Sequence, residues 1–393
     1  MIHQPIVLAF VLSGLVAGVL WLEKKAAFRP LFHYLPGAFW CYFLPMVMST
    51  MGWLPEQSAV YVFLTTYVLS ACLILLLLNI NLPAIFRLGR VSLTAMAVGA
   101  AGIAVGAVVA YSIFARWLPP ETWKGIGALS ASWIGGSANM LAVKEGLQTP
   151  DSVFAPMVIV DTVITYSWMG ILVALVTFQD RWDNWVGADK AALADVNRRL
   201  SEMNTGLEVG GRTAPIWHGI WLLGFGLAIG WLCLKAGERL PEWRNAGLTA
   251  TGWSFLLVTF VGVIFSLTPI SRLERFGASQ WGYLCLYLLL AAIGSKARLQ
   301  YILKAPLLVV MAYVWVLVHA AILATYGFFC RVPMFFLVTS SQANIGGTAS
   351  TPIVAGVYQP RLATLGLLLA IAGNVIGTYA GMLIAQACRW VHP

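Results

Sequence analysis

Long apolar stretches alternate with short polar loops along most of the chain. Twelve of these stretches are long enough to cross about 30 Å of hydrocarbon as a helix. The first, Ile6 to Leu22, runs straight into Glu23 without a small-residue cleavage site, so we expect a retained span and not a signal peptide. The pattern predicts an all-α polytopic membrane protein with spans at residues 6–22, 35–53, 58–79, 91–114, 123–147, 152–179, 216–235, 248–269, 279–294, 305–329, 333–356 and 362–387.

One long polar segment interrupts this pattern. Residues 180–213 cannot form a span because charged side chains recur through them. We expect a linker there, with a surface helix from Lys190 to Met203. The linker divides the chain into a first transmembrane repeat at 1–179 and a second at 214–393.

The composition agrees with this interpretation. The chain has 393 residues, 60% of them hydrophobic and 10% charged, and its mean hydropathy is +0.82, so we expect a lipid bilayer around it. The net charge of +9 does not indicate a nucleic-acid partner, because Lys and Arg lie singly or in small groups between apolar stretches. The six cysteines show no metal-binding or disulfide spacing.

Two distant stretches repeat one unusual pattern. Ser130 to Asn139 reads Ser-Ala-Ser-Trp-Ile-Gly-Gly-Ser-Ala-Asn, and Ser341 to Ser350 reads Ser-Gln-Ala-Asn-Ile-Gly-Gly-Thr-Ala-Ser. A second echo follows each: Asp-Thr-Val-Ile-Thr-Tyr begins at Asp161 and Asn-Val-Ile-Gly-Thr-Tyr at Asn374. Two halves that each carry a Gly-interrupted apolar segment point to the substrate site of a secondary transporter.

Paired glycines flanked by Ser, Thr and Asn allow a membrane helix to unwind locally, provided that the freed backbone groups face protein or a wet cavity. The N-terminal helix ends at such a break suit an anion, and the C-terminal carbonyl groups suit a cation. The alternative is that small residues only permit close helix packing. The repetition favours breaks, and the expected substrate-binding residues are Trp133, Gly135, Gly136, Ser137, Asn139, Gln342, Asn344, Gly346, Gly347, Thr348 and Ser350.

Asp161 lies well inside an apolar helix, where an unpaired charge would cost at least ~2.5–3.5 kcal/mol. We interpret it as the ion-coupling carboxylate. It would bind a sodium ion, with Thr162, Thr165 and broken-helix carbonyl groups completing the oxygen ligands, or it would carry a proton. Asn374 takes the equivalent place in the second half and cannot titrate. The alternative is a neutral carboxyl group held by hydrogen bonds.

Other polar residues have simpler interpretations. His319 is alone in an apolar span, so we favour a hydrogen-bonded packing residue over a proton relay. Lys144 and Glu145 end the fifth span, and a solvated helix end is favoured there over a gate.

The orientation in the membrane stays open. Lys and Arg are more frequent in the loops that become cytoplasmic if both termini lie outside. The two Gly-Gly segments are the fifth and eleventh spans, however, and this even separation makes the repeats parallel, whereas inverted repeats need an odd one.

The residues from Trp133 to Asn139, Asp161, and those from Ser341 to Ser350 resemble a large family of bacterial and plastid membrane proteins. That family is similar to the cation/proton antiporter and anion transporter superfamily, which includes bile-acid/sodium symporters. The resemblance covers nearly the whole chain. It implies inverted repeats, a core domain of crossing broken helices that moves against a scaffold domain in an elevator-like motion, a homodimer, and a place in the bacterial inner membrane.

By this resemblance Asp161 matches the ion-site carboxylate. The chain lacks the two adjacent acids of electrogenic sodium/proton antiporters, because Val160 and Thr162 flank Asp161. We therefore expect a sodium- or proton-coupled transporter of a small organic solute, with anions among the candidates; the alternative is a monovalent cation/proton antiporter. No cofactor besides the coupling ion is expected, and no converging set of catalytic residues indicates an enzyme.

Overall fold

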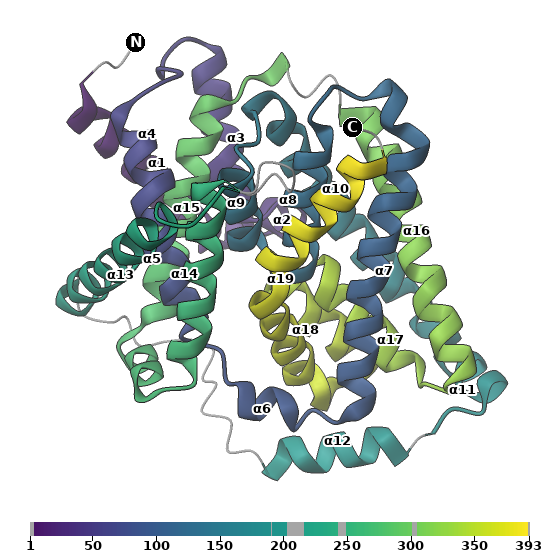
Figure 1. Ribbon diagram of the computed structural model, residues 1–393. Coiled ribbons are helices and arrows are strands. Elements are labelled where there is room, and N and C mark those ends of the chain that lie inside the picture. The colour runs from purple at the N-terminus through teal and green to yellow at the C-terminus, as the bar shows by residue number, and fades with distance from the viewer. Residues whose placement is uncertain (1–3, 190, 203–215, 243–248, 301–304, 392–393) are drawn as a thin grey trace. The chain divides into compact units, whose positions relative to one another are not determined.

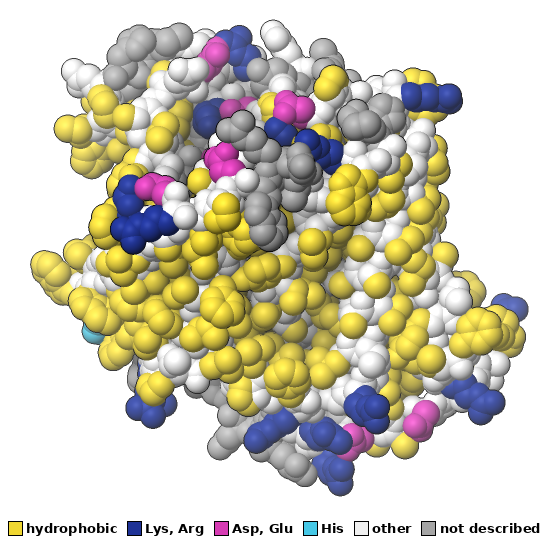
Figure 2. Space-filling model, in the orientation of Figure 1, with side chains coloured by type: hydrophobic (Ala, Val, Ile, Leu, Met, Phe, Trp, Pro, Cys, Tyr) yellow, Lys and Arg dark blue, Asp and Glu magenta, His cyan; other side chains and the backbone are white. Residues whose placement is uncertain are grey.

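The computed structural model describes residues 4–189, 191–202, 216–242, 249–300 and 305–391. Within these ranges the chain forms helices and no strand (Figure 1), which confirms the expected all-α class. Figure 2 shows that hydrophobic side chains cover much of the visible face. Such a surface suits a protein surrounded by lipid.

Eight helical segments of the described chain are long and apolar enough to cross a membrane, or up to nine if one bent pair counts as a span. The expected number of twelve is therefore not reached. The eight are α1 (Pro5–Glu23), α4 to α5 (Ala59–Leu77), α7 with the turn after it (Arg90–Trp117), α10 to α11 (Asp151–Val186), α13 (Ile216–Gly237), α15 (Ala278–Lys296), most of α16 (Ala305–Phe329) and α19 (Ala363–Val391).

The four remaining apolar stretches form shorter helices. Three are α3 (Gly37–Thr50), the pair α8 (Thr122–Gly135) and α9 (Ser137–Gly146), and the pair α17 (Met334–Ile345) and α18 (Gly347–Tyr358). The fourth, α14 (Ala250–Ser266), bends by 91° into the 3-10 helix η6 (Pro269–Phe276). A glycine or a proline lies at the break or bend of each of the three stretches that contain two helices.

The chain divides into two compact units. Unit 1 comprises Met1–Asn79, Leu141–Thr162 and Ala214–Leu308, and unit 2 comprises Ile80–Met140, Val163–Thr213 and Val309–Pro393. Each unit therefore takes segments from both of the expected sequence repeats. The helices α9, α10 and α16 each contribute residues to both units.

In unit 1, α3 and α5 (Leu69–Leu77) pack against α15, and α13 and α14 pack against α5. The Cys72 thiol on α5 donates a hydrogen bond to the Gly282 carbonyl oxygen on α15 at 3.3 Å. A hydrophobic cluster of Leu75, Leu222 and Ala278 joins α5, α13 and α15. The interior of unit 1 is thus apolar over these helices.

In unit 2, contacts fix the directions of the long helices. Gly127 and Gly135 of α8 lie against Ala385 and Gly377 of α19, so α8 and α19 are antiparallel. Met96 and Tyr111 of α7 lie near Gly373 and Cys388 of α19, in the same order along both helices. The helices α7 and α19 are therefore parallel, and α8 runs opposite to both.

The direction of α17 follows from its contacts with α16. The Trp315 indole nitrogen donates to the Ile103 carbonyl oxygen of α7 at 2.7 Å, and the Tyr326 and Thr94 hydroxyl groups lie 2.7 Å apart. Hence α16 is antiparallel to α7. Leu337 lies against Gly327, and Ser341 bonds to His319 nearer the start of α16. Because α17 is antiparallel to α16, it runs with α7 and opposite to α8.

The helices α17 and α18 form a hairpin. Gly356 of α18 lies beside Ala363 at the start of α19, and the Thr351 backbone lies against Gly366 further along. Thus α18 runs opposite to α19, and also opposite to α17, on which it packs. Residues 333–356 therefore return toward the end from which they started, and the expected single span there is wrong. Because α17 runs opposite to α8, the two Gly-Gly segments are not parallel, contrary to what their even separation along the sequence implied.

The expected linker contains two helices in unit 2. The helix α11 (Gln179–Val186) is held by Asp183, whose Oδ1 accepts a hydrogen bond from the Met334 backbone N–H at 2.8 Å. The helix α12 (Ala191–Glu202) confirms the expected surface helix, while residue 190 and residues 203–213 of the linker lie outside the described residues. The linker thus packs on the end of unit 2 where α7 and α19 begin.

That end of unit 2 carries more cations than the opposite one. Arg87, Arg90, Arg181, Arg198, Arg199, Arg331 and Arg361 lie there, whereas the opposite end has Arg116, Lys124 and Arg389. The positive-inside rule therefore predicts that the starts of α7 and α19 are cytoplasmic.

Cys330 offers a direct test of this orientation, because it is exposed at that end while the other five cysteines are buried. We expect a membrane-impermeant maleimide to label Cys330 in inside-out vesicles and not in intact spheroplasts. In a Cys330→Ser background, Trp390→Cys at the other end of unit 2 should show the reverse labelling. Labelling of Cys330 from outside would contradict the assignment.

Candidate functional site

The first helix break in unit 2 lies between α8 and α9. Gly136 has φ +85° and ψ 172°, a backbone conformation that favours glycine. The Gly136 N–H donates to the Ser132 carbonyl oxygen at 2.6 Å and closes α8, and the Asn139 N–H donates to the Gly136 carbonyl oxygen at 3.0 Å and opens α9. The expected break at the first Gly-Gly pair is therefore confirmed.

Asn139 satisfies the backbone at this break. Its side-chain nitrogen donates to the Gly135 carbonyl oxygen at 2.5 Å and to the Asn374 carbonyl oxygen at 3.4 Å. Its side-chain oxygen accepts a hydrogen bond from the Thr378 hydroxyl group at 2.5 Å. Because both ends of the amide are used, Asn139 holds α8 and α9 to α19 and has little capacity left for a solute.

The approach of α8 to α19 depends on glycines that the sequence analysis missed. A Cβ atom on Gly373 would lie 1.9 Å from the Ile134 carbonyl oxygen, and one on Gly135 would lie 2.7 Å from the Gly377 Cα. Gly373 and Gly377 are four residues apart, the spacing by which membrane helices approach closely. This spacing was the sequence signal that could have identified them.

The second break lies between α17 and α18, where Gly347 has φ +62°. The Ile345 carbonyl oxygen accepts a hydrogen bond from the Thr165 hydroxyl group of α10 at 2.9 Å. The Gly346 carbonyl oxygen accepts one from the Ser350 hydroxyl group at 2.9 Å, and the Gln342 side-chain nitrogen donates to the same hydroxyl oxygen at 2.7 Å. Side chains again replace the lost helical hydrogen bonds.

Two side-chain oxygens near this second break are buried without a hydrogen-bond partner among the described residues. They are Oε1 of Gln342 and Oδ1 of Asn344. The orientation of the Asn344 amide is set by its nitrogen, which donates to the carbonyl oxygens of Ser340 at 3.0 Å and Met96 at 3.3 Å. Both oxygens can therefore accept a hydrogen bond or coordinate a cation.

Hydrogen bonds from two other helices fix the middle of α17. The His319 Nδ1 lies 2.9 Å from the Gly99 carbonyl oxygen and must carry a proton to donate to it, so Nε2 of the neutral ring accepts from the Ser341 hydroxyl group at 2.9 Å. The same hydroxyl oxygen accepts from the Trp168 indole nitrogen at 2.9 Å. This network agrees with a packing role for His319, and sequence reasoning did not identify Trp168.

Trp133 is fully buried, and its ring centroid lies 4.5 Å from that of Trp315. Its indole nitrogen has no hydrogen-bond partner in the described part of the chain. Ser137 and Thr348, at the first turns of α9 and α18, are partly exposed. Among the polar side chains of the expected substrate-binding residues, these two belong to residues that are not fully buried.

The expected ion-coupling residues fall in different units. Asp161 and Thr162 belong to unit 1, and Thr165 and Asn374 belong to unit 2. Asp161 is partly buried, and the Thr162 hydroxyl group donates to the Val158 carbonyl oxygen of its own helix at 3.0 Å. The Asn374 side-chain oxygen lies beside Gly136, 3.5 Å from the position that a Cβ atom would take there. The structure thus brings Asn374 to the first break and Thr165 to the second.

Lys144 contradicts the expected solvated helix end. Its side chain is only 4% exposed, and Nζ lies 2.8 Å from Glu145 Oε1 and 3.1 Å from Asp151 Oδ1. Lys296 at the end of α15 reaches the other Asp151 oxygen at 3.6 Å. The ion pairs keep Lys144 charged inside unit 1, and this network ties α9 and α10 to α15.

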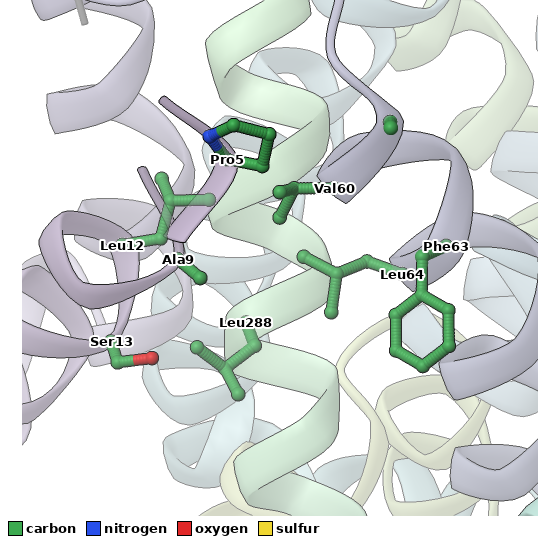
Figure 3. Close-up of a pocket in the computed structure, with 9 residues that line it drawn as sticks. Pro5, Ala9, Leu12, Ser13, Val60, Phe63, Leu64 and Leu288 are labelled. Atoms are coloured by element: carbon green, nitrogen blue, oxygen red, sulfur yellow. The ribbon is translucent and has the colours of Figure 1, made fainter. Parts of the chain in front are cut away.

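A cavity of about 370 Å³ in unit 1 is a poor candidate for the ion site. It lies between α1, α15, α4 (Ala59–Phe63) and the π-helical turn η2 (Leu64–Val68), and Ser13 is the only polar side chain among those that line it (Figure 3). Pro5, Leu12, Phe63 and Leu288 are typical of the rest. An apolar lining offers no ligands for an ion.

The family profile described as "Protein of unknown function (DUF819)" matches residues 10–391. The chain belongs to this family. It is also 26% identical over 348 residues to the uncharacterized membrane protein YjcL of Bacillus subtilis (strain 168), covering 86% of each chain. With eight helices in the described part of the chain that are long and apolar enough to span a bilayer, this DUF819 protein is a multi-pass membrane protein.

The contact between α8 and α19 leads to a prediction about stability. Gly373→Ala would place a methyl group against the Ile134 backbone, which cannot move as a side chain could, so we expect a loss of about 1–3 kcal/mol or more and a lower Tm in detergent. Gly170→Ala is the matched control, because nothing lies within 4 Å of a Cβ atom there. Equal Tm values for the two variants would contradict the close approach.

The burial of Lys144 leads to a second prediction about stability. Lys144→Met leaves Glu145 and Asp151 without their buried partner and should cost ~3–5 kcal/mol, measured as a loss of thermal stability. Lys235→Met removes an exposed pair with Glu238 and should cost at most ~1 kcal/mol. A similar small loss for both variants would show that Lys144 reaches water.

Proposed function

We propose that this protein is an ion-coupled secondary transporter of a small organic solute and that the two helix breaks of unit 2 form its binding region. The observation that carries the proposal is that both breaks belong to one compact unit, on helices α8 and α17 that run in opposite directions. Opposed broken helices are the arrangement that secondary transporters with inverted repeats use around a substrate site.

The polar groups at the breaks support recognition of a solute. The side chains of Asn139, Thr165 and Ser350 already hydrogen-bond to the backbone at the breaks, so the proposed recognition uses other polar groups of the motifs. Gln342 Oε1 and Asn344 Oδ1 are acceptors, suited to a cation or an N–H group of the solute. The first turns of α9 and α18 present Ser137 and Thr348 beside helix N-termini, which favour an anionic group.

Asp161 is the proposed coupling carboxylate. It precedes Thr165 by one turn of the continuous helix α10, so the two side chains share a face of that helix. A sodium ion would take oxygen ligands from Asp161, Thr162 and Thr165 and from carbonyl groups, and a proton would need Asp161 alone. Either ion would neutralise the carboxylate inside the membrane, where its charge is costly.

The remaining parts of the proposal follow from the resemblance. The two Gly-Gly segments would be inverted repeats, a core domain with the broken helices would move against a scaffold domain, and the protein would act as a homodimer in the bacterial inner membrane. The opposed directions of α8 and α17 support the inverted repeats.

A thermal-shift screen of the purified protein tests the proposal. The protein is heated with a panel of organic metabolites, with and without sodium, across a range of pH. We expect a solute that raises Tm only together with sodium or at low pH, because coupled ligands increase each other's affinity. Asp161→Asn should abolish this dependence on the ion.

Asp180→Asn is the matched control, because Asp180 is an exposed acid on α11, and it should behave as the wild type does. Stabilisation by sodium or pH alone, with no effect of any solute, would favour the cation/proton antiporter instead. If Asp161→Asn matches the wild type throughout, Asp161 is not the coupling carboxylate.

A further inference from the structure

Arginines gather at the end of unit 2 where two membrane-spanning helices begin. Arg90 is the first residue of α7, and Arg361 lies in the 3-10 turn η8 (Pro360–Leu362) directly before α19. Because α7 and α19 are parallel and both begin at this end, the two arginines lie at a similar depth. Arg87 ends the short helix α6 (Leu82–Phe86), which packs against α19. These positions flank spans and so belong to the headgroup region.

The helix α12 is fixed at the same level. Val196 is only 2% exposed and lies against Gly89, one residue before α7 begins, and α12 also packs against η8. Two and three residues after Val196, Arg198 and Arg199 are exposed. We call Arg87, Arg90, Arg198, Arg199 and Arg361 the basic face; Figure 2 shows Lys and Arg side chains gathered along the lower edge, where Figure 1 shows α6 and α12.

Two acids with described side chains lie beside the basic face. Asp195 accepts hydrogen bonds from Arg198 and Arg199, each at 2.8 Å, and these bonds hold its pKa below the usual range. Asp189 caps the start of α12 through the Ala191 N–H at 2.9 Å. On the elements that carry the basic face, and counting only the side chains that the structure describes, five arginines lie with two carboxylates, so this described surface is net positive.

The opposite end of the same helices is different. Arg116 lies 3.8 Å from the centroid of Trp117, Arg389 lies 5.4 Å from that of Trp123, and Lys124 pairs with Glu121. Each cation there has an aromatic or acidic partner within its own unit, as is typical of interfacial anchors. The basic face differs because its arginines extend from an amphipathic helix and from the starts of spans.

We propose that the basic face binds the headgroups of anionic phospholipids. A headgroup phosphate accepts the paired hydrogen bonds of a guanidinium group, and a row of arginines beside a surface helix attracts an anionic leaflet by roughly 1 kcal/mol for each cation. The ligand is a lipid and not free phosphate, because the face lies beside the starts of two spans, where headgroups are concentrated. This inference does not depend on the proposed transport function.

Binding can be measured on the full-length protein in a neutral detergent. A fluorophore on Cys330, the exposed cysteine at this end, reports titration with short-chain phosphatidylglycerol, short-chain phosphatidylcholine or inorganic phosphate. We expect saturable binding of phosphatidylglycerol that weakens with salt, and much weaker binding of the other two. The variant with Arg198→Gln, Arg199→Gln and Arg361→Gln should bind phosphatidylglycerol on the order of a hundredfold more weakly, about fivefold for each arginine.

Two control variants separate the basic face from a general effect of charge. The combination of Arg116→Gln and Arg389→Gln removes cations from the opposite end and should leave the affinity unchanged. A variant in which Lys replaces the same three arginines of the basic face should retain most of the affinity for phosphatidylglycerol. This result would show that the fold is intact. Equal binding of the two lipids, equally tight binding of inorganic phosphate, or an equal loss in the opposite-end variant would overturn the proposal.

Discussion

Inside a membrane every backbone N–H and C=O group needs a hydrogen-bond partner within the protein, and the arrangement of unit 2 depends on this constraint. A helix that breaks in an apolar environment frees carbonyl and amide groups that water cannot solvate. Here Asn139 supplies the partner for the Gly135 carbonyl oxygen, and Thr165 and Ser350 supply those for Ile345 and Gly346. The polar residues of the repeated motif are therefore used to make the breaks stable.

Close helix packing brings the partners of these hydrogen bonds within reach of each other. Asn139 contacts the Asn374 carbonyl oxygen and the Thr378 hydroxyl group only because α8 and α19 approach through Gly135, Gly373 and Gly377. Between membrane helices there is little hydrophobic driving force, so small residues and interhelical hydrogen bonds hold them together. The two explanations weighed for the Gly-Gly motif, helix breaking and helix packing, are thus both correct at the first break.

The sequence was sufficient for the parts of the fold that depend on local pattern. The helical class, the surface helix in the linker and both glycine breaks follow from apolar runs and from glycines among polar residues. The hairpin of α17 and α18 was missed because two short apolar helices together have the length of one span. The burial of Lys144 was missed because one of its partners, Asp151, begins the next helix, and Lys296 lies far away in sequence.

The distribution of charge limits how an ion could act on the breaks. The side chains that hydrogen-bond at both breaks are neutral, so a change of charge must begin elsewhere. Thr165 is the residue through which it could act, because its hydroxyl group holds the carbonyl oxygen of Ile345 at the second break and its helix carries Asp161 one turn earlier. A continuous helix keeps that spacing fixed, so neutralisation of Asp161 would change the field at Thr165 without any rearrangement of α10. Coupling by this route needs one carboxylate and one hydroxyl group, which agrees with a motif that has a single acid in its first copy and an amide in its second.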